Sequence, residues 1–372
     1  MKPKAYWIHS SLSTRWGSAV SLSNAFKSKY HEEFELTEIE SKDILASFED
    51  GIFIFGDIHY PREVLLEKLA QLPSGTKVLF HLYGDIFSRI KIFEENKDLF
   101  SHLLFKFSLG STSAYESAKK MVSAENLIYR PYFLGNLPQR TDIKKTGINK
   151  IIYFGRISYF KNVHHLVALF DEFTDSHPDY ELHIAGGIDN FRWRNAPTGS
   201  YFNYAGELFD NALEKVKGRG KRVFYHERVE QKDLFRLAQE MTTFTTLSTC
   251  EEEDFGAAIA EALSLGLNIV ATQWGGHRQF KDCQNTNLVE VSQIRGNLKI
   301  DREELFRAWA NPTKEGEIIN DKNQVWKNTK SDFGKWKKLD QFSNEFSHLK
   351  ASTIVNKEFY EHAEAVLYPL WK

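Results

Sequence analysis

Short apolar runs alternate with helical patterns in two successive series along the 372-residue chain, and this double alternation limits the fold most. Strands that alternate with helices form parallel sheets covered by helices on both faces. A polar stretch over residues 138–150 separates the two series and is the expected linker. We therefore expect an α/β protein with two Rossmann-like, doubly wound parallel-sheet domains that face each other across a cleft.

The apolar runs define the expected elements. The first series predicts the strands Ala5–His9, Phe34–Ile39, Gly51–Phe55, Lys77–Leu82, Leu103–Ser108 and Leu127–Tyr129. Its expected helices are Ser18–Lys29, Arg62–Gln71, Asp85–Glu95 and Ala114–Met121. The second series predicts the strands Ile151–Phe154, Glu181–Ala185, Arg222–Tyr225, Thr242–Leu247, Asn268–Ala271 and Asn287–Val291. The expected domains are 1–145, to which a closing helix at 354–372 returns, and 146–350.

Charge and cysteine content exclude several classes of protein. A net charge of −2 provides no dominant basic field, so nucleic acid is not an expected partner. Two cysteines cannot form a disulfide framework or a zinc ribbon, and Cys250 is expected to be a small buried structural residue. The aromatic content of 14% suits core packing and sugar stacking equally.

The expected location is the cytoplasm. The N-terminus lacks the pattern of a signal peptide, and no apolar run approaches the ~18 residues of a membrane span. Beyond Glu315 the chain becomes lysine-rich around Trp326 and Trp336. A peripheral contact with the inner face of the membrane stays open there, with a solvated connector as the alternative.

Glu253 and Glu261, separated by seven residues, bracket an aromatic residue, a glycine and the start of a helix. Glu253 should lie in a strand-to-helix loop, at the sheet edge where ligands of open parallel sheets bind. The amides of Phe255 and Gly256 would form a helix N-terminus able to receive a phosphate. Two carboxylates beside that terminus suit a ligand with anionic and hydroxyl-rich ends, such as a nucleotide sugar.

Two further motifs accompany the glutamates. The second series opens with Gly155 and Arg156 after a strand, and Lys161 follows at the head of a helix. A double glycine, Gly275–Gly276, follows a later strand. Together the three motifs resemble the large retaining glycosyltransferase family four, of the GT-B fold. The resemblance is sharpest over residues 150–282, is architectural before them and fades after about residue 300.

The resemblance implies the roles of several residues. Arg156 and Lys161 would stabilise the diphosphate of a nucleotide-sugar donor, in keeping with the chemistry of a planar cation and a point charge. Glu253 would hold the donor sugar and Glu261 the ribose. Further donor or nucleotide contacts are implied for Phe255, Gly256, Gly17, Gly155 and Val229. No metal or cofactor is expected, because the chain has no Asp-x-Asp pattern and the family is typically metal-independent.

Other candidates concern the sugar and the acceptor. His81 ends an apolar strand and resembles the family's histidine near the donor sugar, although a strand-end histidine is more often structural. The first domain would lie on the acceptor side, with Trp16 and Asp85 as candidate acceptor contacts. A long aromatic loop over residues 188–204 contains Trp193 and would act as a lid or acceptor contact.

The chain departs from the family pattern at three positions. Asp254 and Glu227 replace glycines, and Gln279 stands where an acid is frequent. The identity of the nucleotide base therefore cannot be inferred from the resemblance to the family. The resemblance implies transfer of a hexose-type sugar to a glycan, lipid-linked or small-molecule acceptor with retention of configuration, in glycan or polysaccharide biosynthesis. Two alternatives stay open: an inverting transferase or nucleotide-sugar epimerase, and a non-catalytic nucleotide- or glycan-binding protein.

Overall fold

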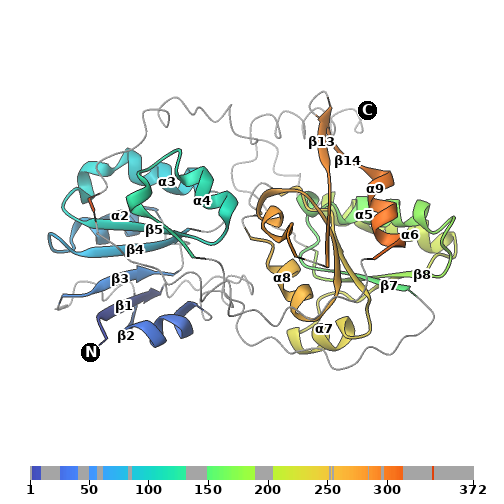
Figure 1. Cartoon of the computed structure of the whole chain (residues 1–372), viewed down its shortest axis with the longest axis horizontal. Coiled ribbons are helices and arrows are strands. Elements are labelled where there is room, and N and C mark those ends of the chain that lie inside the picture. The colour runs from blue at the N-terminus through green and yellow to red at the C-terminus, as the bar shows by residue number, and fades with distance from the viewer. Residues whose placement is uncertain are drawn as a thin grey trace. The chain divides into compact units, whose positions relative to one another are not determined.

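The computed structural model describes residues 2–9, 26–40, 50–56, 62–82, 86–130, 149–188, 204–250, 253, 255–283, 285–294, 297–312 and 337–338. The chain divides into two compact units, Met1–Gly135 with Asp321–Lys372, and Asn136–Asn320 (Figure 1). The expected domain bounds stay predictions, and β7 begins at Asn149, within the expected linker.

The first unit contains a six-stranded parallel sheet in the order β2-β1-β3-β4-β5-β6. Its strands are β1 (Lys4–His9), β2 (Glu35–Glu40), β3 (Ile52–Phe55), β4 (Lys77–Leu82), β5 (Leu104–Leu109) and β6 (Leu127–Tyr129). Its helices are α2 (Arg62–Ala70), α3 (Ile86–Glu95), α4 (Thr112–Ala118), the 3₁₀ turns η2 (Lys97–Phe100) and η3 (Ala124–Asn126), and residues 26–33. The six expected strands are all present, with ends that shift by a residue.

Aromatic side chains fill the first unit. Alternate residues of its strands point to opposite faces, so one face packs against α2, α3 and α4 and the other against residues 26–33. On the first face, the Phe80 ring stacks on Phe55 at 4.5 Å between centroids and lies 4.9 Å from Phe93. The described phenylalanines of this unit therefore serve packing, which the composition alone left undecided.

Lys337 protects an exposed edge of this sheet. β4 pairs with the whole of β5 on one side, but on the other side β6 pairs only with residues 107–109. The beginning of β5 therefore has no strand on its side away from β4. There the amide of Phe105 donates to the carbonyl of Lys337 at 2.9 Å, and the Asn126 side chain donates to the same oxygen at 3.4 Å. The Lys337 ammonium pairs with Glu125. A segment far along the chain thus satisfies backbone groups that an open edge would expose.

The second unit contains another six-stranded parallel sheet, in the order β12-β11-β10-β7-β8-β9. Its strands are β7 (Asn149–Phe154), β8 (Tyr180–Ala185), β9 (Val223–Tyr225), β10 (Thr243–Thr246), β11 (Asn268–Thr272) and β12 (Thr286–Val289). Its helices are η4 (Tyr159–Lys161), α5 (Val163–Phe173), α6 (Tyr204–Gly218), α7 (Gln231–Ala238), α8 (Ala257–Ser264), η5 (Gly275–Phe280) and α9 (Arg302–Ala310). Figure 1 shows α5, α6 and α9 on one side of this sheet and α7 on the other.

The end of the second unit differs from the sequence-based expectation. The expected strand Asn287–Val291 stops at Val289, and a separate antiparallel hairpin follows, β13 (Val291–Ile294) and β14 (Asn297–Ile300). Helix α9, which we did not expect, begins at Asp301, whose side chain accepts from the Glu304 amide at 2.9 Å. Trp309 of α9 is fully buried and donates to Thr245 Oγ1 at 3.1 Å, which fixes the helix to the sheet.

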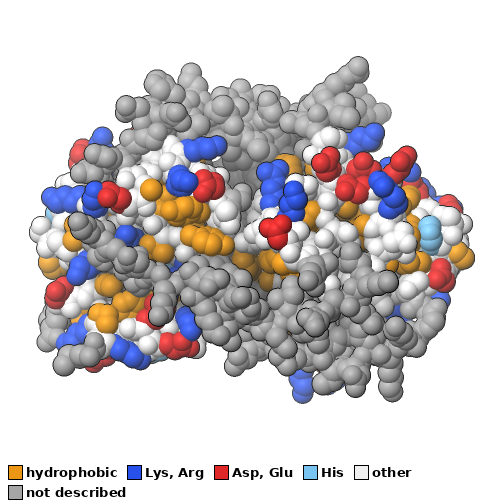
Figure 2. Space-filling view, in the orientation of Figure 1, with side chains coloured by type: hydrophobic (Ala, Val, Ile, Leu, Met, Phe, Trp, Pro, Cys, Tyr) orange, Lys and Arg blue, Asp and Glu red, His pale blue; other side chains and the backbone are white. Residues whose placement is uncertain are grey.

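The surface of each unit carries both signs of charge. On the face shown in Figure 2, Lys and Arg side chains alternate with Asp and Glu side chains over the described parts of both units. This mixture agrees with the net charge of −2.

Two glycines allow the loops after β7 and β8 to approach closely. A Cβ atom added at Gly186 would lie 1.8 Å from the carbonyl oxygen of Gly155. Gly155 itself has a φ of 146°, a conformation that side chains disfavour. The amide of Ile157 donates to Gly187 at 3.0 Å across the same contact. The backbone that leads to Arg156 is therefore held by a contact that only glycine permits.

We predict that Gly186→Ala destabilises the second unit. The added methyl group must displace the Gly155 backbone, at a cost of about 1–3 kcal/mol. Gly218→Ala is the matched control, because no atom lies within 4 Å of a Cβ at this helical glycine, and it should be neutral or stabilising. Thermal unfolding of both variants checks the prediction, and equal melting temperatures would contradict it.

Candidate functional site

The strand order of the second unit reverses between β10 and β7. β7 is followed along the chain by β8 on one side, whereas β10 and β11 lie on its other side. In open parallel sheets, loops diverge at such a point and leave a crevice at the carboxyl ends of the strands. The loops after β7 and after β10 are those that contain Lys161 and Glu253. The topology therefore brings together two motifs that lie 92 positions apart.

Asn162 joins these two loops. It has a left-handed backbone, with φ of 54°, and its side-chain amide donates to the carbonyl of Leu247 at 2.8 Å and to Thr249 Oγ1 at 2.9 Å. The Thr249 amide returns a hydrogen bond to the carbonyl of Phe160 at 3.0 Å. Asparagine adopts this conformation more readily than most residues. The bonds fix the position from which the Lys161 side chain extends.

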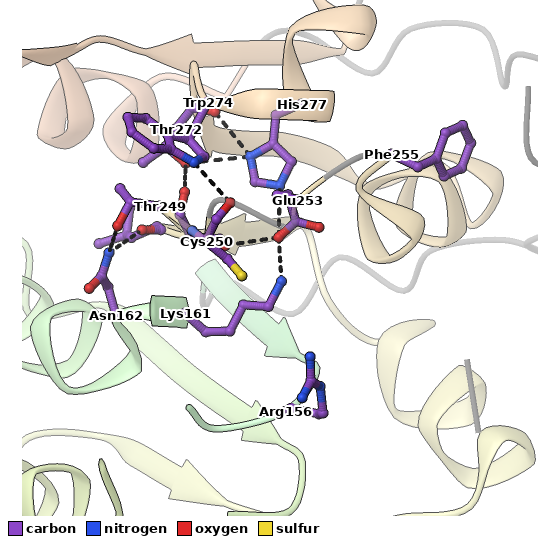
Figure 3. Close-up of polar contacts among 12 residues, drawn as sticks. Arg156, Lys161, Asn162, Thr249, Cys250, Glu253, Phe255, Thr272, Trp274 and His277 are labelled. Carbon is purple, nitrogen blue, oxygen red and sulfur yellow. Dashed lines mark hydrogen bonds and ion pairs between the residues drawn. The ribbon is translucent and has the colours of Figure 1, made fainter. Parts of the chain in front are cut away.

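The centre of the site is an ion pair between Lys161 and Glu253 (Figure 3). Both side chains are largely buried, with 18% and 13% of their surfaces exposed. Burial lowers the pKa of Lys161, but the Glu253 carboxylate and the Cys250 thiol together raise it, so the net direction is upward. For Glu253, burial raises the pKa, whereas Lys161 and then His277 hold it well below its usual range. Both groups are therefore charged at neutral pH.

The same carboxylate oxygen of Glu253 has two other neighbours. The Ser248 hydroxyl donates to Glu253 Oε2 at 2.8 Å, and His277 Nε2 lies 3.6 Å from it. Because a buried charge needs several partners to offset its lost hydration, this set explains how the pair can remain in the interior.

The double glycine holds Glu253 through its backbone. The Gly276 amide donates to the Glu253 carbonyl at 2.6 Å, and a Cβ at Gly275, whose φ is 47°, would lie 2.4 Å from that oxygen. His277 follows in η5, is 2% exposed, and donates from Nδ1 to the carbonyl of Thr272 at 3.1 Å. We did not identify His277 from the sequence. Its only signal there is its position directly after the double glycine.

Helix α8 begins beside this cluster. Gly256 precedes its first turn in a left-handed conformation, with φ of 81°. Phe255 is 7% exposed and packs edge-on against Phe280 at 5.7 Å between centroids. Gln279, which stands in place of an acid in the family pattern, donates to the carbonyl of Phe255 at 2.5 Å. The first amides of a helix have no partner within it, so this terminus can receive an anion.

Glu261 lies on the second turn of α8 and is partly buried. Burial raises its pKa to about 7. Its carboxyl group therefore differs from that of Glu253, which is held ionised by cations. A carboxyl group in this state can donate as well as accept hydrogen bonds near neutral pH.

The remaining expected donor residues of this unit occupy nearby loops. Arg156 is exposed, and its carbonyl accepts from the Tyr153 hydroxyl at 2.7 Å. Val229 is partly buried in the loop between β9 and α7. In that loop Glu227 has a φ of 51°, and its carbonyl accepts from the Gly186 amide at 2.7 Å. A left-handed backbone gives a physical reason for the glycine that the family pattern favours at this position.

Cys250 is partly buried, whereas the sequence predicted a buried residue. Its carbonyl accepts from Trp274 Nε1 at 2.9 Å, so its backbone supports the loop between β10 and Glu253.

His81 lies in the interior of the first unit, 1% exposed. Its Nε2 lies 2.9 Å from the Tyr30 hydroxyl, and the Phe26 ring packs on it at 4.4 Å between centroids. Burial, and then the nearby charge of Arg130, lower its pKa well below the usual range. His81 is thus a neutral histidine enclosed by residues 26–33, and its expected role near the donor sugar stays a prediction.

Several expected residues lie outside the described part of the chain. These are Trp16, Gly17, Asp85, Trp193 and the acidic neighbours Glu251, Glu252 and Asp254, together with the expected lid and the closing helix at 354–372. Among the described residues, no group of three or more His, Cys, Asp or Glu could hold a metal ion. In the same part of the chain, no helix is long and apolar enough to cross a membrane.

Comparison with known proteins identifies the class of fold. Residues 114–295 match the family model "Glycosyl transferases group 1", a match that spans slightly less than half of the chain and includes Lys161, Glu253 and Glu261. A search of the curated proteins finds no significant match. The family match covers the switch point and α8, the elements that form the site.

Solved structures show similarity over most of the chain. A trehalose-6-phosphate structure from E. coli, bound with UDP-2-fluoro glucose, has 10% identity and a TM-score of 0.55 over 95% of this chain and 99% of that chain. The lipopolysaccharide outer core galactosyltransferase WaaB has 13% identity and a TM-score of 0.51, with 87% and 98% covered. The GtfA/B complex has 16% identity and a TM-score of 0.53, with 77% and 56% covered.

These similarities confirm the fold. The chain has the GT-B architecture of two α/β units, each with a six-stranded parallel sheet, as the alternation of strands and helices predicted. It spans 57% and 56% of the length of two of the similar chains, the pneumococcal O-GlcNAc transferase GtfA and the GtfA/B complex.

We predict that Glu261→Gln stabilises the protein more at pH 8 than at pH 5. A carboxyl group whose folded-state pKa is raised contributes stability below its unfolded value, about 4.3, and loses it as the pH rises through the folded value of about 7. Glutamine does not titrate, so the variant should gain on the order of 1–3 kcal/mol at pH 8, the shift being discounted for partial exposure.

Thermal unfolding at the two pH values measures this difference. Glu214→Gln, at an exposed position of α6, is the matched control and should shift the melting temperature equally at both. A pH-independent effect of Glu261→Gln would contradict the prediction.

Proposed function

We propose that this chain is a glycosyltransferase that moves a hexose-type sugar from a nucleoside diphosphate sugar to an acceptor hydroxyl, with retention of anomeric configuration. The observation that carries the proposal is the buried Lys161–Glu253 pair at the switch point of the second sheet, beside the N-terminus of α8. A cation, a carboxylate and open helix amides in one crevice match a ligand that is anionic at one end and hydroxylated at the other.

In the proposed reaction, the bond between the sugar's anomeric carbon and the phosphate oxygen breaks. The acceptor oxygen forms the new bond on the same face, and its proton passes to the departing phosphate oxygen. The leaving diphosphate gains negative charge as the bond breaks, and Lys161, Arg156 and the α8 amides would stabilise that charge. These cations allow the reaction to proceed without a metal ion or other cofactor, which is part of the proposal.

Glu253 and Glu261 would bind the hydroxyl-rich parts of the donor. The side-chain contacts of Glu253 with Lys161, Ser248 and His277 all involve Oε2, and the other carboxylate oxygen has no dashed line to the residues drawn in Figure 3. That oxygen would accept from hydroxyls of the sugar. Glu261, on the second turn of α8, would form hydrogen bonds with the ribose hydroxyls. These hydroxyls can replace the water that a partly buried carboxyl group loses.

We extend the proposal to the biological setting. The acceptor would be a hydroxyl of a glycan, a lipid-linked sugar or a small molecule, in glycan or polysaccharide biosynthesis. We propose the cytoplasm as its location, with the lysine-rich stretch beyond residue 315 as a contact with the inner face of the membrane.

We predict that Lys161→Ala lowers turnover of the donor on the order of 10²-fold or more, since a charge contact that strengthens as the leaving group departs is lost. The measurement is release of nucleoside diphosphate from UDP-, GDP- and ADP-glucose. Lys232→Ala, at an exposed position of α7, is the control and should retain the wild-type rate.

The single variant also leaves Glu253 buried without its cation. A Lys161→Ala, Glu253→Gln double variant removes that unpaired charge. Thermal unfolding of the single and double variants therefore shows whether the buried charge of Glu253 unfolds Lys161→Ala. Turnover within a few-fold of wild type in folded Lys161→Ala would overturn the proposed role. Nucleotide binding by the wild type without any transfer would support the non-catalytic alternative.

A further inference from the structure

If the site binds a donor, two anionic groups compete for the Lys161 ammonium group. Its ammonium group contacts the Glu253 carboxylate in the structure, and the proposed function assigns the same group to the diphosphate. Because the side chain has one charge, its contact with Glu253 weakens as it turns toward phosphate. The Glu253 carboxylate, 13% exposed, then needs another positive partner to remain ionised.

His277 is placed to be that partner. Its Nδ1 lies 3.1 Å from the carbonyl of Thr272, which can only accept, so Nδ1 carries a proton. The Thr272 hydroxyl lies 3.4 Å from the same nitrogen and donates its one proton to the carbonyl of Ser248. Toward His277 this hydroxyl can therefore only accept. The second nitrogen, Nε2, faces Glu253 Oε2 at 3.6 Å. An ionised carboxylate accepts only, so this contact is attractive when Nε2 is also protonated.

We infer that His277 is a positioning residue for donor binding. Its imidazolium holds the Glu253 carboxylate ionised and oriented while Lys161 exchanges that carboxylate for the donor diphosphate. The inference rests on the proposed function, and it adds an electrostatic role for a residue that the glutamate, Gly-Arg and double-glycine motifs do not include. Ser248 alone could not replace His277, because a hydroxyl supplies a hydrogen bond but no charge.

The surroundings of His277 fix its orientation. A Cβ added at Gly256 would lie 2.9 Å from the ring carbon Cδ2, so α8 begins in contact with the imidazole. The charged groups that face it are Glu253 directly and Lys161 across that carboxylate, with the Cys250 thiol beside Lys161. A ring held between the Thr272 carbonyl and α8 can reach Glu253 without rearrangement, which is what a positioning residue requires.

The test compares two ligands that differ in the sugar and in the free terminal phosphate that the sugar replaces. Dissociation constants are measured by calorimetry for UDP, GDP and ADP and for their glucose conjugates, on wild type and on folded variants. Glu253 would contact the sugar, whereas Lys161, Arg156 and Glu261 would contact parts that both ligands share. The extra phosphate charge of the free diphosphate is the same for every protein at a fixed pH. A change in the ratio between wild type and a variant therefore reports the sugar contribution.

His277→Leu should reduce the affinity gained from the sugar at least tenfold while changing nucleoside diphosphate affinity little. His277→Gln, whose amide can donate to Glu253 but carries no charge, should lose most of the gain as well, and it remains available if the leucine variant does not fold. Arg278→Gln is the matched control, since the exposed Arg278 side chain donates to Gln273 on the adjacent turn and should leave the ratio unchanged.

The outcomes separate the two proposals. A sugar gain that falls in His277→Leu and in His277→Gln, but not in Arg278→Gln, supports the inference. If sugar nucleotides bind wild type but the gain is unchanged in folded His277→Leu or His277→Gln, the inference is wrong and the proposed function stands. Absence of binding by folded wild type for the whole panel would overturn both.

Discussion

The buried ion pair of Lys161 and Glu253 joins the two loops that diverge at the switch point of the second sheet. Its stability depends on the polar groups and the backbone contacts that surround it. Removing two charges from water is costly, and mutual attraction offsets that cost only when further polar groups assist. Here Ser248 and His277 assist from the side of the carboxylate. The backbone is fixed by Asn162 on one loop and by the double glycine on the other. The site is thus preorganised by short, specific contacts rather than by a large apolar core.

Left-handed backbone positions explain why the motif glycines cannot be exchanged freely. Gly155, Gly256 and Gly275 all have positive φ values, and two of them also face atoms closer than a side chain would allow. Glu227 is the exception, since a side-chain-bearing residue adopts φ of 51° there. That conformation costs on the order of 1 kcal/mol, which the bond from the Gly186 amide to the Glu227 carbonyl helps to offset. The departure from the family pattern is therefore compatible with an intact loop.

Most of the sheet architecture could be predicted, because continuous apolar runs bounded by turn residues identify buried parallel strands. Helix α9 could not, since its two buried residues, Leu305 and Trp309, span a single turn, which is too short for a periodic pattern. The meeting of Lys161 with Glu253 follows from topology once the motifs are known. The contact of His277 with Glu253 could not be predicted in this way, because one buried polar residue after a turn leaves no periodic signal in the sequence. For His81 the deciding contacts come from Phe26 and Tyr30, distant in sequence.

The position of Lys337 has a consequence for how the protein is made. The first unit consists of Met1–Gly135 and Asp321–Lys372, so the segment that covers the edge of β5 is synthesised about 200 residues after that strand. A ribosome adds residues at about 5–20 per second. This edge therefore stays uncovered for on the order of 10 s or longer, until the segment that contains Lys337 has been synthesised. The second unit is continuous in sequence and has no such delay. During translation, the beginning of β5 therefore stays open to pairing with another strand on its side away from β4.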